Sequence, residues 1–234
     1  DLQSASHSKD ISPGLASAAA HNQGQLDKLR SIPQESTETT HFSAWDRWGN
    51  VVSNTYTLNF SYGNGISVAG AGFLLNNEMD DFSAKPGSPN GYGLIGGAAN
   101  AIEPKKRPLS SMTPTIVFNR DGAPVLATGS PGGSTIITVV MQMILNIVDF
   151  DMNVAEATAA PRIHHQWLPD RVFYESGVSA DTLGLLRGMG HQLSDKTRRL
   201  GATESIQSDG STPFLYGTAD HRRDGSGVAV PAAD

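Results

Sequence analysis

Residues 39–60 read TTHFSAWDRWGNVVSNTYTLNF and carry the clearest structural pattern in this sequence of 234 residues. Two runs rich in aromatic and β-branched residues flank the turn-forming tetrapeptide RWGN, which predicts a β-hairpin. In the second run Ser53, Thr55 and Thr57 occupy alternate positions, so one side of that strand is polar. Such a side is typical of a solvated strand, and it is also what a strand lining a polar site would show.

A second hairpin and a helix are predicted in direct succession further along the chain. Strand arms over residues 115–118 and 125–128 flank an Asp-Gly turn. The apolar run 136–148 is 13 residues long, which is too short to span a bilayer. It predicts a buried helix, with Ser134 as its N-cap.

Two further helices are predicted nearer the C-terminus. Asn153 and Glu156 form a capping box that begins one helix, which ends before Pro161. The other spans residues 179–189 and ends at Gly190, with three apolar residues on one face. These are Leu183, Leu186 and Met189. Strand pairs followed by helices predict an α+β architecture in which helices cover the sheets.

The segments between and around these elements have a different composition. Residues 1–38 are rich in Ser, Ala, Gln and charge, which indicates a linker or tail. Residues 61–108 are rich in Gly and Pro and predict long loops, which in a compact domain are usually functional or disordered. We expect the chain after Gly217 to be a mobile tail. The N-terminus shows no export signal.

The overall composition excludes several classes of function. Seventeen Lys and Arg against 23 Asp and Glu give a net charge of −6, so the chain lacks the basic footprint of a nucleic-acid-binding protein. A hydrophobic content of 38% fits a soluble globular protein. The absence of cysteine excludes disulfides, thiol nucleophiles and cysteine-ligated zinc within this sequence.

The glycine-rich segment GSPGGST, residues 129–135, joins a predicted strand to a predicted helix. Backbone N–H groups converge at a helix N-terminus and can hold negative charge there. A phosphate-binding loop of the GxxxxGK[ST] type is excluded, because the segment has no Lys. Two interpretations remain: a tight turn, or an oxyanion hole formed by the N–H groups of Gly132 and Gly133.

Six motifs of the chain stand in a characteristic order. They are TTHFSAWDRWGN, TYTLNFSYGNGI, LLNNEMDDFSAKPG, KKRPLSSMTPTIV, TGSPGGS and APRIHHQWLPD. In order and spacing this series closely resembles the small subunit of bacterial γ-glutamyltranspeptidases. The resemblance runs from Thr39 to about Asp220, which is most of the chain, and several of the motifs are specific to that family.

The resemblance implies an N-terminal nucleophile hydrolase, with a four-layer αββα sandwich that a large subunit completes. In that family a precursor cleaves itself before a Thr, so the cut here is expected between Glu38 and Thr39. Residues 1–38 would then be the C-terminal tail of the large subunit, and residues 39–234 the small, catalytic subunit.

The activity that the resemblance implies is γ-glutamyl transfer and hydrolysis on glutathione and other γ-glutamyl amides, through an ester on Thr39. A cleaved Thr supplies a hydroxyl nucleophile and an α-amine, whose unperturbed pKa of about 7.7 to 8.0 suits a base at neutral pH. Thr57 would orient the hydroxyl, while the N–H groups of Gly132 and Gly133 would hold the oxyanion. Water, or the amine of an amino acid or dipeptide, would resolve the ester.

The resemblance also implies residues that bind the zwitterionic end of the donor. Their expected roles are ammonium binding, carboxylate binding and closure of a lid. They are Asn59, Glu78 and Asp81 for the ammonium, Ser110 and Ser111 for the carboxylate, and Tyr92 for the lid. At position 78 some family members carry Gln where this chain has Glu, and both side chains can accept a hydrogen bond from an ammonium.

Metal and cofactor chemistry is not expected. Neither the pair Asp80-Asp81 nor the pair His164-His165 has a further ligand at metal-binding spacing, and the histidines are expected to be structural. The partners that the resemblance implies are a large subunit from the same precursor, with an Arg for the donor carboxylate, and small-molecule donors and acceptors. It also implies a periplasmic or secreted location, with no nucleic acid bound and no membrane span.

Two alternative functions stay open. One is the related acylase activity on glutaryl side chains of β-lactam precursors, which lack an α-amine. Asp81 argues against this activity, because its charge has a purpose only where an ammonium is bound. The other alternative is an unprocessed, non-catalytic precursor fragment.

Overall fold

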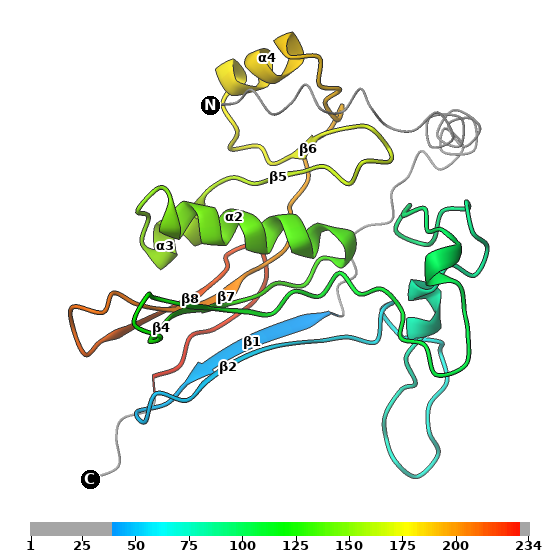
Figure 1. The fold of residues 1–234 in the computed structure, drawn as a ribbon, viewed down its shortest axis with the longest axis horizontal. Helices are drawn as coiled ribbons and strands as arrows, with labels where there is room; N and C mark the ends of the chain where they lie inside the picture. Colours follow the sequence, from blue (N-terminus) through cyan, green and yellow to red (C-terminus); the bar gives the residue numbers. More distant parts are fainter. Residues whose placement is uncertain (1–38, 230–234) are drawn as a thin grey trace.

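The computed structural model describes residues 39–229, which form an α+β fold built from stacked layers (Figure 1). The strands are β1 (Thr40–Trp45), β2 (Val51–Tyr56), β3 (Thr115–Phe118), β4 (Pro124–Thr128), β5 (Ile163–His164), β6 (Phe173–Tyr174), β7 (Glu204–Ser208) and β8 (Leu215–Ala219). The helices are α2 (Ile136–Val148), α3 (Val154–Ala159) and α4 (Ala180–Gly188), with short 3-10 turns η2 (Glu78–Asp81), η3 (Ala98–Asn100) and η4 (Gly133–Thr135).

Three layers are visible in Figure 1, with α2 and α3 above a sheet and the β1–β2 pair below it. The central sheet has four antiparallel strands in the order β3-β4-β7-β8. The pair β1–β2 packs against β4 and β7 on the face away from the helices. The predicted α+β class is therefore confirmed. None of the helices within residues 39–229 is long and apolar enough to cross a membrane.

Both predicted hairpins are present. Strands β1 and β2 pair antiparallel with Thr40 opposite Tyr56, and β3 pairs with β4 with Thr115 opposite Thr128. The expectation of a mobile tail after Gly217 is wrong for its first residues, because Thr218 and Ala219 pair with β7 and Asp220 and Arg222 are buried. Residues 224–229 are exposed and lie in no helix or strand. The last residues of the tail, 230–234, and the predicted linker 1–38 lie outside the described part of the chain.

Buried polar groups join the β1–β2 pair to the central sheet. Ser43 Oγ donates to the carbonyl of Glu204 at 2.8 Å, and Ser53 Oγ donates to the carbonyl of Thr128 at 2.9 Å. The imidazole of His41 is 2.7 Å from Thr55 Oγ1, and burial lowers its pKa to about 4, so the ring is neutral at pH 7. The polar side of the second strand thus faces the neighbouring sheet instead of solvent.

Gly129 is required where that imidazole meets β4. A side-chain carbon at this position would lie 2.2 Å from the ring of His41, inside the contact distance of any two atoms. Because glycine has no side chain, the β1–β2 pair can approach the central sheet closely where His41 of β1 meets Gly129.

Helix α2 has the predicted bounds, but only one of its sides is buried. Ile136, Val139 and Met143 are at most 1% exposed, whereas Ile137 and Met141 on the other side are about half exposed. A polar stripe that includes Thr138 and Gln142 contacts β5, so in the described structure the apolar side with Ile137 and Met141 is the one left open.

The N-cap predicted for α2 is wrong. Thr135 precedes the first helical residue, and no side chain caps the helix. The 3-10 turn η4 lies between the glycine turn and α2, so Ser134 falls inside that turn. Its hydroxyl donates to Gln166 Oε1 at 2.8 Å instead.

The two later helices largely follow the prediction. Asn153 and Glu156 form the expected capping box at the start of α3. Helix α4 begins after Ser179, which accepts a hydrogen bond from Thr182 N. Leu183 and Leu186 are half-buried, but Met189, the residue that follows the last helical position, is 61% exposed.

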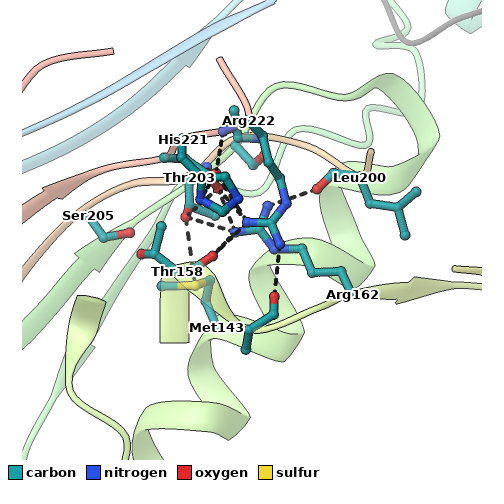
Figure 2. A network of polar contacts seen from close by, with 12 residues as sticks. Met143, Thr158, Arg162, Leu200, Thr203, Ser205, His221 and Arg222 are labelled. Atoms are coloured by element: carbon teal, nitrogen blue, oxygen red, sulfur yellow. Dashed lines mark hydrogen bonds and ion pairs between the residues drawn. The ribbon is translucent and has the colours of Figure 1, made fainter. Parts of the chain in front are cut away.

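A buried ion network fixes the C-terminal segment against the helices (Figure 2). Arg162 Nη2 lies 2.7 Å from Asp220 Oδ2, and Arg222 bridges Asp220 at 3.1 Å and Glu175 at 2.6 Å. The Asp220 carboxylate is fully buried and also accepts from the backbone N–H of Thr203 at 2.9 Å. Burial alone would raise the pKa of Asp220, but Arg162 and the backbone N–H groups lower it below its usual value.

This network generates a stability prediction for the variant Asp220→Asn. The substitution keeps the shape but leaves Arg162 and Arg222 without one buried counter-charge, so the free energy of unfolding should fall by about 3 kcal/mol. The pKa of Asp220 is depressed in the folded state, so its stabilisation is present above the pKa in the unfolded chain and is lost as the pH falls below it. Urea denaturation followed by circular dichroism at neutral and at acid pH would measure both effects.

The matched control is Glu103→Gln, which removes the exposed ion pair between Glu103 and Lys106. Exposed pairs contribute at most about 1 kcal/mol, so this variant should unfold close to the wild type. Equal losses in the two variants would contradict the prediction.

Candidate active site

Thr39 lies at the start of β1 and is held from both sides. Its hydroxyl is 2.9 Å from Thr57 Oγ1, just beyond the end of β2, because the antiparallel register brings these two strand ends together. Arg223 Nη1 donates to the carbonyl of Thr39 at 3.0 Å from the C-terminal segment. The side chain is buried, with 3% of its residue surface exposed.

A cavity opens beside this threonine pair. It is lined by nine of the ten residues singled out in the sequence, which the structure gathers from six separate segments. They are Thr39, Thr57, Asn59, Glu78, Asp81, Tyr92, Ser110, Ser111 and Gly133. The tenth, Gly132, is buried directly behind Gly133 and does not line the cavity.

The Gly132-Gly133 turn has a backbone that other residues rarely adopt, with φ angles of 136° and 56°. The carbonyl of Gly132 accepts from Thr135 N at 3.1 Å and from Thr135 Oγ1 at 2.9 Å. That carbonyl and the N–H of Gly133 belong to one planar peptide, so these two bonds also fix the direction of the N–H. The turn therefore presents an oriented backbone donor near the cavity.

One end of the cavity is acidic. Glu78 and Asp81 both come from η2, and no Lys or Arg lines the cavity within residues 39–229. Burial, together with repulsion from Asp81, raises the pKa of Glu78 to about 7, and burial also raises the pKa of Asp81. Glu78 Oε1 is buried without a hydrogen-bond partner. A small cation with N–H donors would neutralise the pair and satisfy this oxygen.

Neutral hydroxyl groups stand elsewhere around the same cavity. Ser110 and Ser111 line it, and Ser110 Oγ accepts from Met112 N at 3.2 Å. These hydroxyls can donate hydrogen bonds to an anionic group, which the acidic end would repel.

Tyr92 closes over part of the cavity. Its hydroxyl lies 2.9 Å from both the backbone oxygen and the side-chain oxygen of Asn59, to which it donates. A side-chain carbon at Gly133 would lie 2.7 Å from the Tyr92 ring, so the ring rests directly on the glycine turn. Asn59 is buried with a φ of 72°, and its N–H donates to Thr57 Oγ1 at 2.8 Å. These contacts connect the tyrosine loop with the threonine pair.

The two adjacent histidines occupy different environments. His164 is buried, and its ring nitrogens lie 2.8 Å from Thr138 Oγ1 and 3.0 Å from Gln166 Oε1, as expected for a structural side chain. His165 is exposed and pairs with Asp170 at 3.0 Å. In the described part of the chain, no group of three or more His, Cys, Asp or Glu side chains is placed to hold a metal ion.

Sequence reasoning missed two residues that contact the site from outside the cavity. Arg223 lies in the segment expected to be mobile, and no pattern in the sequence points to its contact with Thr39. Gln166 contacts both the Tyr92 loop and Ser134, and it lies inside the motif APRIHHQWLPD. In that motif it is the amide of Gln166 that contacts the residues around the site, whereas the adjacent histidine pair gave no such signal in the sequence.

Comparisons with known proteins identify the family of this chain. The family model described as gamma-glutamyltranspeptidase matches residues 2–230. The glutathione hydrolase proenzyme of Escherichia coli strain K12 is 51% identical over 221 residues, which is 94% of this chain. The chain spans only 38% of the length of that relative.

Solved structures show the same fold. A gamma-glutamyltranspeptidase from Pseudomonas nitroreducens, complexed with L-DON, is 47% identical with a TM-score of 0.75; the match covers 82% of this chain and all of that one. A cephalosporin acylase from Bacillus halodurans is 26% identical with a TM-score of 0.70, and the match covers 91% of this chain and 39% of that one. Since the family model covers nearly the whole sequence, the chain belongs to the gamma-glutamyltranspeptidase family.

Proposed function

We propose that this chain carries the catalytic site for γ-glutamyl transfer and hydrolysis, acting on glutathione and other γ-glutamyl amides. The observation that carries this proposal is the pair of threonine hydroxyls, 2.9 Å apart, beside a cavity that has an acidic end and a glycine turn. The family and its glutathione hydrolase relatives support the same reaction.

The reaction begins when Thr39 Oγ attacks the γ-carbonyl carbon of the donor. Once the chain is cut before Thr39, the α-amine of that residue accepts the hydroxyl proton, and Thr57 orients the hydroxyl. The N–H groups of Gly132 and Gly133 stabilise the negative charge that develops on the carbonyl oxygen. The amine of the donor leaves with the proton, and a γ-glutamyl ester remains on Thr39. Water resolves this ester by hydrolysis, and the amine of an amino acid or dipeptide resolves it by transfer.

The nucleophile is released by cleavage between Glu38 and Thr39, and Glu38 lies outside the described residues. Residues 1–38 then form the end of a large subunit, and residues 39–234 form the small subunit. Two observations support this division: Thr39 directly precedes the first strand within the described residues, and 82% of this chain is matched by the whole of a solved transpeptidase chain.

The donor's α-ammonium binds at the acidic end of the cavity, between Glu78, Asp81 and Asn59. Its α-carboxylate binds to the hydroxyls of Ser110 and Ser111, and Tyr92 covers the bound donor. The support is chemical: the buried Glu78 Oε1 has no hydrogen-bond partner and can accept from an ammonium, and the two serines offer hydroxyls that can donate to a carboxylate.

A large subunit of the same precursor is the proposed partner. The outer side of α2 and the outer side of the β1–β2 pair carry large apolar residues that water would otherwise contact. They include Ile137, Met141 and Val148 on the helix, and Phe42, Val52 and Tyr56 on the strands, which are 44% to 55% exposed. Helices of the partner over the outer side of the strand pair would add the fourth layer of the sandwich. A periplasmic or secreted location rests on the family resemblance alone.

Glutaryl acylase activity is the second candidate, supported by the fold shared with the Bacillus halodurans cephalosporin acylase. Glutaryl donors have no α-amine, so they would leave Glu78 and Asp81 without a cation. The acidic end of the cavity therefore favours γ-glutamyl donors.

A non-catalytic, unprocessed fragment would keep Thr39 joined to Glu38.

The variant Thr39→Ala tests the proposed function. It should abolish both self-cleavage and turnover, because a single hydroxyl performs both attacks. Denaturing gel electrophoresis and a γ-glutamyl transfer assay measure the two outcomes. Two bands from this variant would show that another residue makes the cut.

The variant Asp81→Asn tests recognition of the donor ammonium. The amide keeps a hydrogen-bonding group but loses the charge, and charge-assisted bonds are about twice as strong as neutral ones. Turnover of γ-glutamyl donors should therefore fall by about tenfold, whereas glutaryl donors serve as the matched control and should lose less. Equal losses on both donors would show that Asp81 does not recognise the α-amine.

The pH dependence of donor binding tests the role of Glu78. Its pKa of about 7 in the empty site means that the carboxyl is neutral below that pH, so the KM for γ-glutamyl donors should rise as the pH falls through 7. Glu78→Gln removes the titrating group and should flatten this part of the KM profile. Glu103 is an exposed carboxyl outside the cavity, so Glu103→Gln should keep the wild-type dependence of KM on pH. A wild-type KM that is constant from about pH 5.5 to 7.5 would refute this role.

A further inference from the structure

Gln166 connects two parts of the site that are far apart in the sequence. Its Nε2 donates to the carbonyl of Tyr92 at 3.3 Å, and its Oε1 accepts from Ser134 Oγ at 2.8 Å. Ser134 follows Gly133 directly, and the ring of Tyr92 rests on that glycine. One side-chain amide therefore contacts both the loop that closes the cavity and the turn that carries the backbone donor.

The orientation of this amide is fixed by its surroundings. Nε2 faces two carbonyl oxygens, those of Tyr92 and Leu168, and the latter lies 3.1 Å away. Carbonyls only accept, so the nitrogen must face them, and the oxygen must face Ser134 and His164. His164 Nε2, 3.0 Å from Gln166 Oε1, supports the amide from its buried side. The amide is thus a rigid connection between the loop and the turn.

The contacts of Tyr92 show what the connection controls. Its hydroxyl is bonded to Asn59, and its carbonyl is bonded to Gln166, so the loop is held at both ends of this residue. Within the loop, Tyr92 N and Leu94 N donate to Asn90 Oδ1 at 3.0 Å, and Gly93 N donates to the carbonyl of Asn90 at 2.9 Å. Loss of Gln166 would remove the bond to the Tyr92 carbonyl and leave the bonds of the Tyr92 hydroxyl to Asn59 in place.

We propose that Gln166 is a positioning residue, whose amide couples closure of the Tyr92 loop to the placement of the Gly133 N–H. The inference rests on the proposed function, because that function assigns donor binding to the loop and oxyanion stabilisation to the turn. Gln166 does not touch the donor. It acts through Tyr92 on donor binding and through Ser134 on the chemical step.

The test is Gln166→Met in the assembled enzyme, with the large subunit present. Methionine has a similar length and neither hydrogen bond, so the amide hydrogens of Tyr92, Gly93 and Leu94 should exchange with solvent about fivefold faster. The KM for a γ-glutamyl donor should rise and kcat should fall. Hydrogen exchange does not need turnover. If the wild type shows no γ-glutamyl turnover, the proposed function fails, but the exchange rates of the loop amides still test this inference.

Two further variants separate the two contacts of the amide. Ser134→Ala removes only the contact with the turn, so kcat should fall while amide exchange in the Tyr92 loop stays at the wild-type rate. The control Asp170→Asn breaks the exposed pair with His165 in the same loop as Gln166, and should leave both exchange and kinetics unchanged. This split between kcat and loop exchange would not arise from a general loss of stability.

Two results would overturn the proposal. One is wild-type exchange of the three loop amides in Gln166→Met, and the other is an equal effect in Asp170→Asn. Should Gln166→Met fail to fold, Gln166→Glu replaces it, because the carboxylate still accepts from Ser134 but cannot donate to Tyr92. Faster exchange of the same amides is expected there as well, and an unchanged rate overturns the proposal.

Discussion

The buried ion network around Asp220 is the constraint on which the rest of the structure depends. Two guanidinium groups and two carboxylates are removed from water together, and each is stable there only while its partners remain in place. The network fixes the C-terminal segment against the end of α3. Because Arg223 follows Arg222 directly, the same network places the guanidinium that holds the carbonyl of Thr39.

From this fixed point the site is assembled by strand register and by close backbone approach. The β1–β2 register brings Thr39 and Thr57 together, and neutral polar contacts join that pair of strands to the central sheet. Glycines allow the remaining approaches, at position 129 against His41 and at position 133 against Tyr92. The residues that line the cavity thus offer backbone donors and hydroxyls, and both of its carboxylates come from η2.

The cavity combines two carboxylates, Glu78 and Asp81, with the neutral hydroxyls of Ser110 and Ser111. Burial raises the pKa of Glu78 and Asp81, so the empty site is unfavourable for two carboxylates and favourable for a cation between them. The hydroxyls of Ser110 and Ser111 are neutral, so a carboxylate near them meets donors without a second negative charge. The proposed orientation of the donor rests on this difference in charge between the residues that line the cavity.

The sequence by itself determined both hairpins, the bounds of α2 and the capping box of α3, because each depends on neighbours within a few residues. Its motifs also selected Thr39, Thr57 and the residues that line the cavity. Only the tertiary structure decided the pairing of β7 with β4, the burial of the segment after Gly217 and the contacts of Gln166 and Arg223. These depend on groups that are distant along the chain, such as Arg162 and Asp220, whose charges are stable in the interior only once the fold has brought them together.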